Sequence, residues 1–148
     1  MHKQDLHTKI ALWVNRGVAL LVFALLFFLP AILRWYSGIR MLTQLDQNGI
    51  MIAFYCCAVV IFIALWNVER LLNNILAERV FVQENVLCIR RIQWCCGGVS
   101  LLCVPASFFY MPLAFLVVIM AFACLMVSVV ARVMDKAVAI REENDLTI

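Results

Sequence analysis

Three long stretches without a charged side chain constrain this sequence more than any other feature. Residues 17–33, 47–68 and 92–131 contain no Asp, Glu, Lys or Arg, and most of their side chains are apolar. A helix crosses the hydrocarbon core of a bilayer with about 20 residues, at a rise of about 1.5 Å per residue. The first two stretches each suit one crossing, and the third, with 40 residues, is long enough for two.

The third stretch contains its own signals for a turn. Residues 107–112 read SFFYMP, and Pro112 suits the first turn of a new helix because proline lacks a backbone donor. Pro105 falls inside the preceding helix and predicts a kink there. One unbroken helix would overshoot the bilayer about twofold. We therefore expect two spans joined by a turn at 107–112.

These spans predict an all-α integral membrane protein with a single membrane domain, residues 1–148. Its four transmembrane helices are expected at about residues 14–34, 48–67, 92–110 and 112–132. The composition agrees, since 66% of the residues are hydrophobic and only 14% are charged, which lies well outside the range of a soluble domain. The first span is expected to be retained, because it exceeds the apolar region of a signal peptide and offers no small-x-small cleavage site.

The basic residues predict how the chain is threaded. Ten of the twelve Lys and Arg residues lie before residue 17, between residues 68 and 92, or after residue 131, and only Arg34 and Arg40 lie elsewhere. Cytoplasmic segments carry an excess of Lys and Arg, so both termini are expected in the cytoplasm. Amphipathic aromatic residues prefer the headgroup level. Those near the expected span ends are Trp13, Trp35, Trp66, Trp94 and Tyr110.

Residues 67–91 form the longest polar interruption, and their pattern predicts a helical hairpin on the cytoplasmic side. Apolar residues recur there at helical spacing. They are Val68, Leu71, Leu72, Ile75 and Leu76. The second helix is therefore expected to continue from about residue 50 to 79, with a connection at 80–83. Asn85 is expected to cap the next helix, and Glu84 is favourable beside the positive end of its dipole.

Two interpretations of this hairpin are open. Its apolar stripe either lies among lipid headgroups and neighbouring helices, or the stripe and Phe81 at the tip dock a soluble protein. The tail, residues 133–148, poses the same choice between a fraying end and a peptide offered to a partner. In this tail Val133, Ala137 and Ile140 share one helical face, and the last three residues suit an extended segment.

Short motifs in the hairpin carry a family resemblance. Residues 81–86 read FVQENV and residues 90–94 read RRIQW. Together with the acidic, apolar-ended terminus at 142–148, they resemble a family of small bacterial four-span membrane proteins catalogued as domain of unknown function 2975. The resemblance implies a bacterial inner-membrane location and no established activity. Members of this family are often encoded beside a small helix-turn-helix regulator, which the resemblance implies as a candidate partner.

The residues expected to bind such a partner are pattern residues of the hairpin. They are Phe81, Glu84, Asn85, Arg90 and Arg91. No direct contact with nucleic acid is expected, because the basic residues are interleaved with acidic ones instead of forming a block. The oligomeric state is left open.

Seven cysteines invite a redox or metal interpretation, which their placement disfavours. Four of them form two adjacent pairs, at 56–57 and 95–96, and no pair has the Cys-x-x-Cys spacing of thiol oxidoreductases. The expected outer loops contain no cysteine. Buried cysteine behaves as a small hydrophobe, so packing is the expected role. Both histidines precede the first span, so no metal or haem site is predicted.

The sequence predicts no enzyme active site and no cofactor. Residues 17–33, 47–68 and 92–131 contain no Asp, Glu, Lys, Arg or His, whereas transporters place such groups inside the membrane. No phosphate-binding loop or nucleophile elbow is present. The first functional hypothesis is therefore a regulatory or scaffold module that holds a cytoplasmic partner. The alternatives are a small channel or transporter formed by oligomerisation, and a membrane thiol redox enzyme, against which the missing outer cysteines argue.

Overall fold

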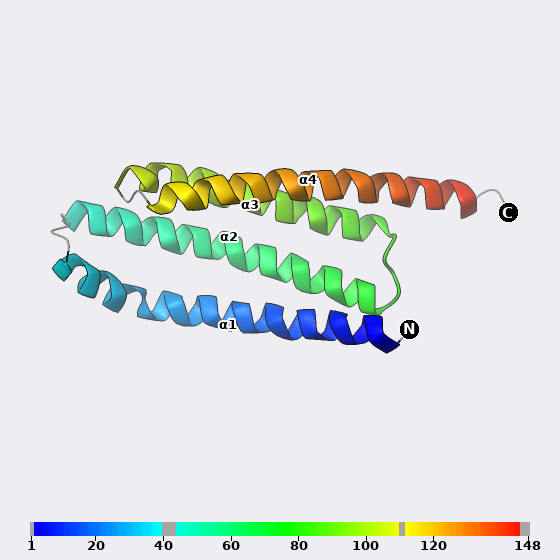
Figure 1. Ribbon diagram of the computed structural model, residues 1–148, viewed down its shortest axis with the longest axis horizontal. Coiled ribbons are helices and arrows are strands. Elements are labelled where there is room, and N and C mark those ends of the chain that lie inside the picture. Colours follow the sequence, from blue (N-terminus) through cyan, green and yellow to red (C-terminus); the bar gives the residue numbers. More distant parts are fainter. Residues whose placement is uncertain (1, 40–43, 110–111, 146–148) are drawn as a thin grey trace.

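The part of the chain that the structure describes forms four long helices and no strand. The computed structural model describes residues 2–39, 44–109 and 112–145. The helices are α1 (His2–Ile39), α2 (Gln44–Leu76), α3 (Gln83–Phe109) and α4 (Pro112–Asp145). The predicted all-α fold is confirmed. The chain runs back and forth, so that α1 begins and α4 ends at the end of the molecule where α2 is joined to α3 (Figure 1).

Each of these helices is long and apolar enough to cross a membrane. Their apolar segments are Leu6–Trp35, Asn48–Leu76, Gln83–Phe108 and Leu113–Asn144. Many large side chains point away from the protein, and Phe27 and Phe108, for example, are 79% and 86% exposed. Such a surface is unfavourable in water but is stable against lipid hydrocarbon. The chain is therefore a multi-pass membrane protein.

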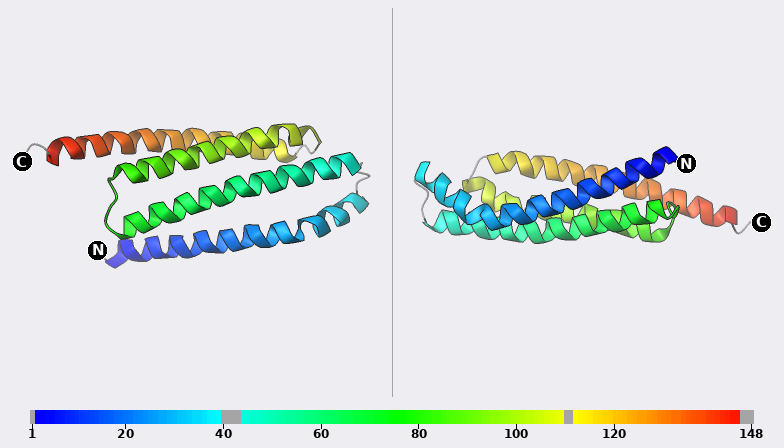
Figure 2. Two further views of the ribbon diagram at one scale, coloured as in Figure 1. Left: turned by 180° about the vertical axis from the view of Figure 1, so that it is seen from behind. Right: turned by 90° about the horizontal axis from the view of Figure 1, so that it is seen from below.

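The helices pack in the order of the chain. α1 contacts α2, α2 contacts α3, and α3 contacts α4, and within the described ranges no other two helices approach closely along their backbones. Figure 1 and the left view of Figure 2 show α1 along one edge of the molecule and α3 and α4 along the opposite edge, with α2 between them. The backbones of the first and last helices therefore do not approach each other closely.

The core between the helices is built from small residues. Cys57 of α2 and Val99 and Cys103 of α3 form its centre. Small side chains let helix backbones approach closely, which favours association inside a membrane, where the hydrophobic effect gives no drive between helices. Gly97 illustrates this approach, because a methyl group added there would stand 3.4 Å from Cys124 Sγ. α3 and α4 therefore meet at van der Waals distance.

Pro105 and Pro112 have the predicted positions relative to the helices. α4 begins at Pro112, since a missing backbone donor costs nothing in the first turn of a helix, and Pro105 lies inside α3. α3 continues through Phe109, so the turn expected at 107–112 is shorter than predicted. Tyr110 lies outside the described residues. The four tryptophans are all exposed, and their place at the headgroup level stays a prediction.

Candidate partner-binding site at the α2–α3 connector

Residues 77–82, the connector, join α2 to α3. α2 ends in a Schellman motif, in which the Arg79 N–H donates to Asn74 O and the Glu78 N–H donates to Ile75 O, both at 3.0 Å. Glu78 adopts a left-handed backbone with a φ of 60°, where glycine is usual. α2 stops at Leu76. The predicted end of this helix at about residue 79 is therefore too late, because no glycine marks the stop.

Asn85 fastens the connector to the helices on either side. Its side chain is fully shielded, with 0% exposure. Its Nδ2 donates to the backbone carbonyls of Arg79 at 2.7 Å and Val80 at 2.8 Å, and its Oδ1 accepts a hydrogen bond from Asn74 Nδ2 at 2.7 Å. Both amide protons and the amide oxygen are thus engaged. These bonds hold the connector in one conformation.

The prediction that Asn85 caps α3 is wrong. α3 begins at Gln83, and the backbone N–H of Asn85 already donates to Val82 O at 3.0 Å. The Asn85 side chain reaches back to the connector and to the last turns of α2 instead of to the N–H groups of its own helix. Glu84 does lie in the first turn of α3, where a negative charge is favourable.

Several apolar side chains are fully buried at this end of the molecule. They include Val86 and Cys88 of α3 and Val138 of α4. Val138 lies beyond the fourth expected span, so α4 remains packed on the protein as far as Val138, whereas residues 139–144 are exposed.

The tail is helical through Asp145, and the choice between a fraying end and a partner-binding peptide stays a prediction. Val133 and Ile140, on the predicted apolar face, are exposed, whereas Val138 is buried. Residues 146–148, expected to be extended, lie outside the described residues.

Ion pairs join each helix to the next at the connector end. They are Arg16 with Glu69 at 2.8 Å, Arg70 with Glu84 at 3.7 Å, and Arg90 with Asp135 at 3.9 Å. All three pairs are partly exposed, and such pairs contribute about 1 kcal/mol or less. They mainly help to position the helices, because each ion pair joins two consecutive helices near the connector end.

The structure gives the five predicted partner-binding residues different roles. Asn85 is buried, and Glu84 and Arg90 take part in ion pairs while remaining partly exposed. Phe81 lies in the connector and is 43% exposed, and Arg91 is exposed on α3. Four of the five are therefore available at the surface near the connector, whereas Asn85 is not.

Two cysteines that the sequence does not pair lie in contact. The Sγ atoms of Cys57 and Cys103 are 3.7 Å apart in the buried core, although 46 residues separate them in the chain. The adjacent pairs do not act as units: Cys56 is exposed whereas Cys57 is buried. All seven cysteines are free. Within the described ranges, no group of three or more His, Cys, Asp or Glu side chains is placed to hold a metal ion.

A family model described as "Protein of unknown function (DUF2975)" matches residues 4–148, nearly the whole chain. The chain belongs to this family. The match confirms the resemblance found in the hairpin motifs and extends it over all four helices. No curated protein and no solved structure matches the chain. Membership of this family assigns no reaction, so the case for a function rests on the geometry of the connector end.

Proposed function

We propose that this family member is a regulatory or scaffold protein of the bacterial inner membrane that holds a cytoplasmic protein at its connector. Both termini and the connector lie in the cytoplasm. The partner docks on Phe81 and on the polar side chains around it. The family resemblance makes a small helix-turn-helix regulator the first partner to test.

The charge distribution supports this orientation. The start of α1, the connector and the end of α4 lie at one end of the molecule (Figure 1). Only Arg34 and Arg40, of the twelve basic residues, belong to the segment between the first and second spans. Because basic residues are retained on the cytoplasmic side, this distribution supports a cytoplasmic connector end.

The exposure of Phe81 on a fixed connector is the observation that carries this function. α2 continues for about 15 Å beyond Trp66, which marks the headgroup level, before the connector begins. Phe81 therefore projects beyond the hydrocarbon, where lipid chains do not cover it. An exposed aromatic side chain is a frequent anchor of protein interfaces.

The surroundings of Phe81 suit a partner that is partly polar. Asn85 already holds the connector in place, so docking costs little conformational entropy. In the turns that precede its C-terminal end, α2 carries a hollow of about 470 Å³ lined by Trp66, Glu69, Arg70, Asn73 and Asn74. An apolar anchor with a polar rim is the usual anatomy of a transient interface.

Co-purification of matched variants tests the docking site. The tagged protein is purified in mild detergent as wild type, Phe81→Ser and Leu6→Ser. Leu6 is a matched control because it is 57% exposed and lies near the start of α1, at the same end of the molecule. We expect wild type and Leu6→Ser to retain the regulator and Phe81→Ser to lose it. Retention by Phe81→Ser, or no binding of any regulator by wild type, would overturn the docking site.

Reporter fusions test the orientation separately. A fluorescent protein that folds only in the cytoplasm should fluoresce when it is fused after α4 or inserted in the connector. Alkaline phosphatase, which is active only outside the cytoplasm, should be inactive at both positions. The opposite pattern would contradict the threading. We assign the chain no reaction and no cofactor.

A further inference from the structure

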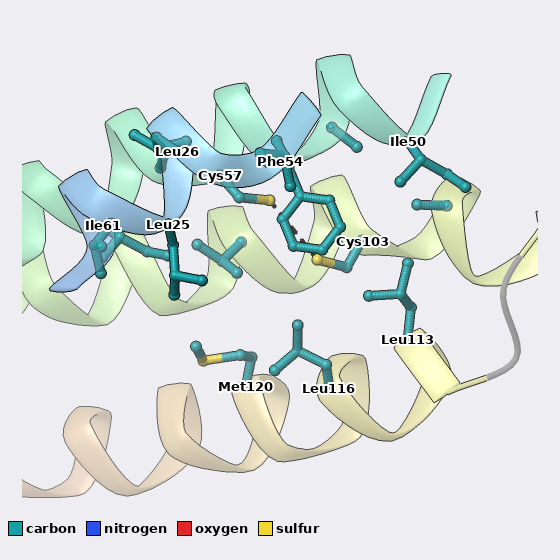
Figure 3. Close-up of a pocket in the computed structure, with 16 residues that line it drawn as sticks. Leu25, Leu26, Ile50, Phe54, Cys57, Ile61, Cys103, Leu113, Leu116 and Met120 are labelled. Carbon is teal, nitrogen blue, oxygen red and sulfur yellow. Dashed lines mark hydrogen bonds between the residues drawn. The ribbon is translucent and has the colours of Figure 1, made fainter. Parts of the chain in front are cut away.

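A cavity of about 240 Å³ lies between the helices in the half of the molecule away from the connector. All four helices contribute to its wall, including Leu26 of α1, Phe54 and Cys57 of α2, Cys103 of α3, and Leu116 and Met120 of α4 (Figure 3). It is separate from the proposed docking site, because its wall contains no residue of the connector. Its contents are therefore a separate question from the cytoplasmic partner.

The wall of this cavity is apolar throughout. Every lining residue is Val, Leu, Ile, Ala, Phe, Met or Cys. A water molecule inside would find none of the two to four polar partners that it needs, and apolar cavities of about 150 Å³ stay dry and accept apolar molecules of the size of benzene. Left empty, the wall would lose the dispersion contacts that a filled cavity provides. An apolar occupant is therefore favoured.

The helix order indicates where such an occupant enters. α1 and α4 both line the cavity, yet their backbones do not approach each other closely, which leaves the space between them to side chains and to whatever the cavity holds. The medium next to this gap is lipid hydrocarbon, because both helices expose apolar side chains along their length. Acyl chains are the apolar molecules present there at the highest concentration.

The shape of the cavity also suits a chain. Its wall follows α2 from Ile50, near the start of the helix, to Ile61, which is about 16 Å along the axis. On α4 it extends from Leu113, at the start of that helix, to Met120. The cavity is thus elongated and reaches from the membrane surface opposite the connector toward the middle of the bilayer.

We propose that this cavity binds one acyl chain of a phospholipid, which enters between α1 and α4 from the leaflet opposite the connector. The chain end lies near Ile61 and Met120, and the part nearer the headgroup lies near Ile50 and Leu113. The phospholipid thereby fills the gap that the open helix order leaves.

Photo-crosslinking of the full-length protein in phosphatidylcholine vesicles tests the site. One probe is phosphatidylcholine with a diazirine at the end of an acyl chain, and a second carries the diazirine near the acyl carbonyl. Mass spectrometry should find adducts of the first probe at Ile61 and Met120 and adducts of the second at Ile50 and Leu113. Adducts confined to outward-facing residues such as Leu101 would overturn the proposal. Equal labelling of both depths by both probes would overturn the direction of entry.

A substitution that fills the cavity with a larger side chain provides the matched comparison. Ala53 lines the cavity, and Ala53→Phe should lower the yield of chain-end adducts at Ile61 and Met120 several-fold while the Leu101 adduct persists. Ala24 is exposed on α1 and is not part of the wall, so Ala24→Phe should leave every yield unchanged. Unchanged labelling of the cavity in folded Ala53→Phe would contradict a bound chain. If Ala53→Phe fails to fold, the depth pattern of the two probes on wild type still decides the question.

Discussion

Asn74 in the last turns of α2 donates its side-chain Nδ2 to Oδ1 of Asn85 in the first turns of α3, at 2.7 Å. The Asn74 backbone carbonyl also accepts the hydrogen bond that ends α2. Asn74 therefore takes part both in the C-terminal cap of α2 and in the hydrogen bond that joins α2 to α3. The connector between them is fixed by both ends, which is why Phe81 can be presented in a defined position.

Removing the Asn85 amide should loosen the connector. In Asn85→Ala, the carbonyls of Arg79 and Val80 lose their donor, and the unfolding free energy should fall by about 1–3 kcal/mol. Asn85→Asp should cost at least as much, because a carboxylate of the same shape would face two carbonyl oxygens. Thermal unfolding in detergent and the rate of tryptic cleavage after Arg79 measure both effects.

Exposed Asn73 supplies the control: the unfolding free energy of Asn73→Ala should stay within about 0.5 kcal/mol of wild type. Equal effects of the Asn73 and Asn85 changes would show that the Asn85 hydrogen bonds do not stabilise the connector.

Glu78→Gly should stabilise the protein. Glu78 is held at a φ of 60°, a conformation that is unfavourable for a residue with a Cβ atom and open to glycine. Part of the gain is offset by the greater freedom of glycine in the unfolded chain. We expect a net increase of about 0.5–1 kcal/mol in thermal or denaturant unfolding. Glu78→Ala removes the same charge but keeps the Cβ atom, so it should show no such increase. A similar gain in both variants would instead assign the effect to the charge.

Charge reversal tests whether the ion pair of Arg16 and Glu69 ties α1 to α2. Arg16 Nε and Nη2 lie 3.0 and 2.8 Å from the same oxygen, Glu69 Oε1. Arg16→Glu and Glu69→Arg should each lower stability, and the double exchange should restore part of the loss. The coupling energy for a partly exposed pair is expected at about 0.5–1 kcal/mol in low salt, and it should shrink as salt is added. Strictly additive effects in low salt would show that the two residues contribute independently.

The sequence predicts the elements of this fold better than their mutual arrangement. The charge-free stretches fix four helices because helix length and bilayer thickness are simple physical constraints, and Pro112 marks a helix start through its own backbone chemistry. The sequence does not predict the left-handed backbone at Glu78. Glycine would have indicated that conformation, but here it occurs at a glutamate as part of the Schellman motif. The same holds for Asn85, whose role depends on where α2 lies beside α3.

The sequence also does not predict the contact between Cys57 and Cys103 or the apolar cavity, and the physical reason is again the relative placement of the helices. Contact between Cys57 and Cys103 requires a particular register of α2 against α3, and periodicity within either helix does not determine it. The apolar cavity requires in addition that α1 and α4 remain apart. Inside a bilayer every helix face is apolar, so the pattern of apolar residues gives weak information on which face meets which neighbour.

Oxidative cross-linking tests that register directly. In a variant that keeps only Cys57 and Cys103 and has alanine at the other five cysteine positions, copper phenanthroline should form an intramolecular disulfide. The two sulfurs already lie 3.7 Å apart, and a disulfide requires their approach to about 2.05 Å. Trypsin cleaves after Arg79 in the connector, so the fragments before and after this site should migrate together without reductant and separate with it.

A control pair shows whether the disulfide reports proximity or only collisions of mobile helices. Cys56 is exposed and neighbours Cys57 on α2, but adjacent residues of a helix point in different directions. A variant that keeps only Cys56 and Cys103 should therefore cross-link much more slowly under the same oxidant. Equal rates for the two pairs would mean that α2 rotates against α3 on the timescale of oxidation. That result would contradict a single register, and with it the cavity wall that Cys57 and Cys103 share.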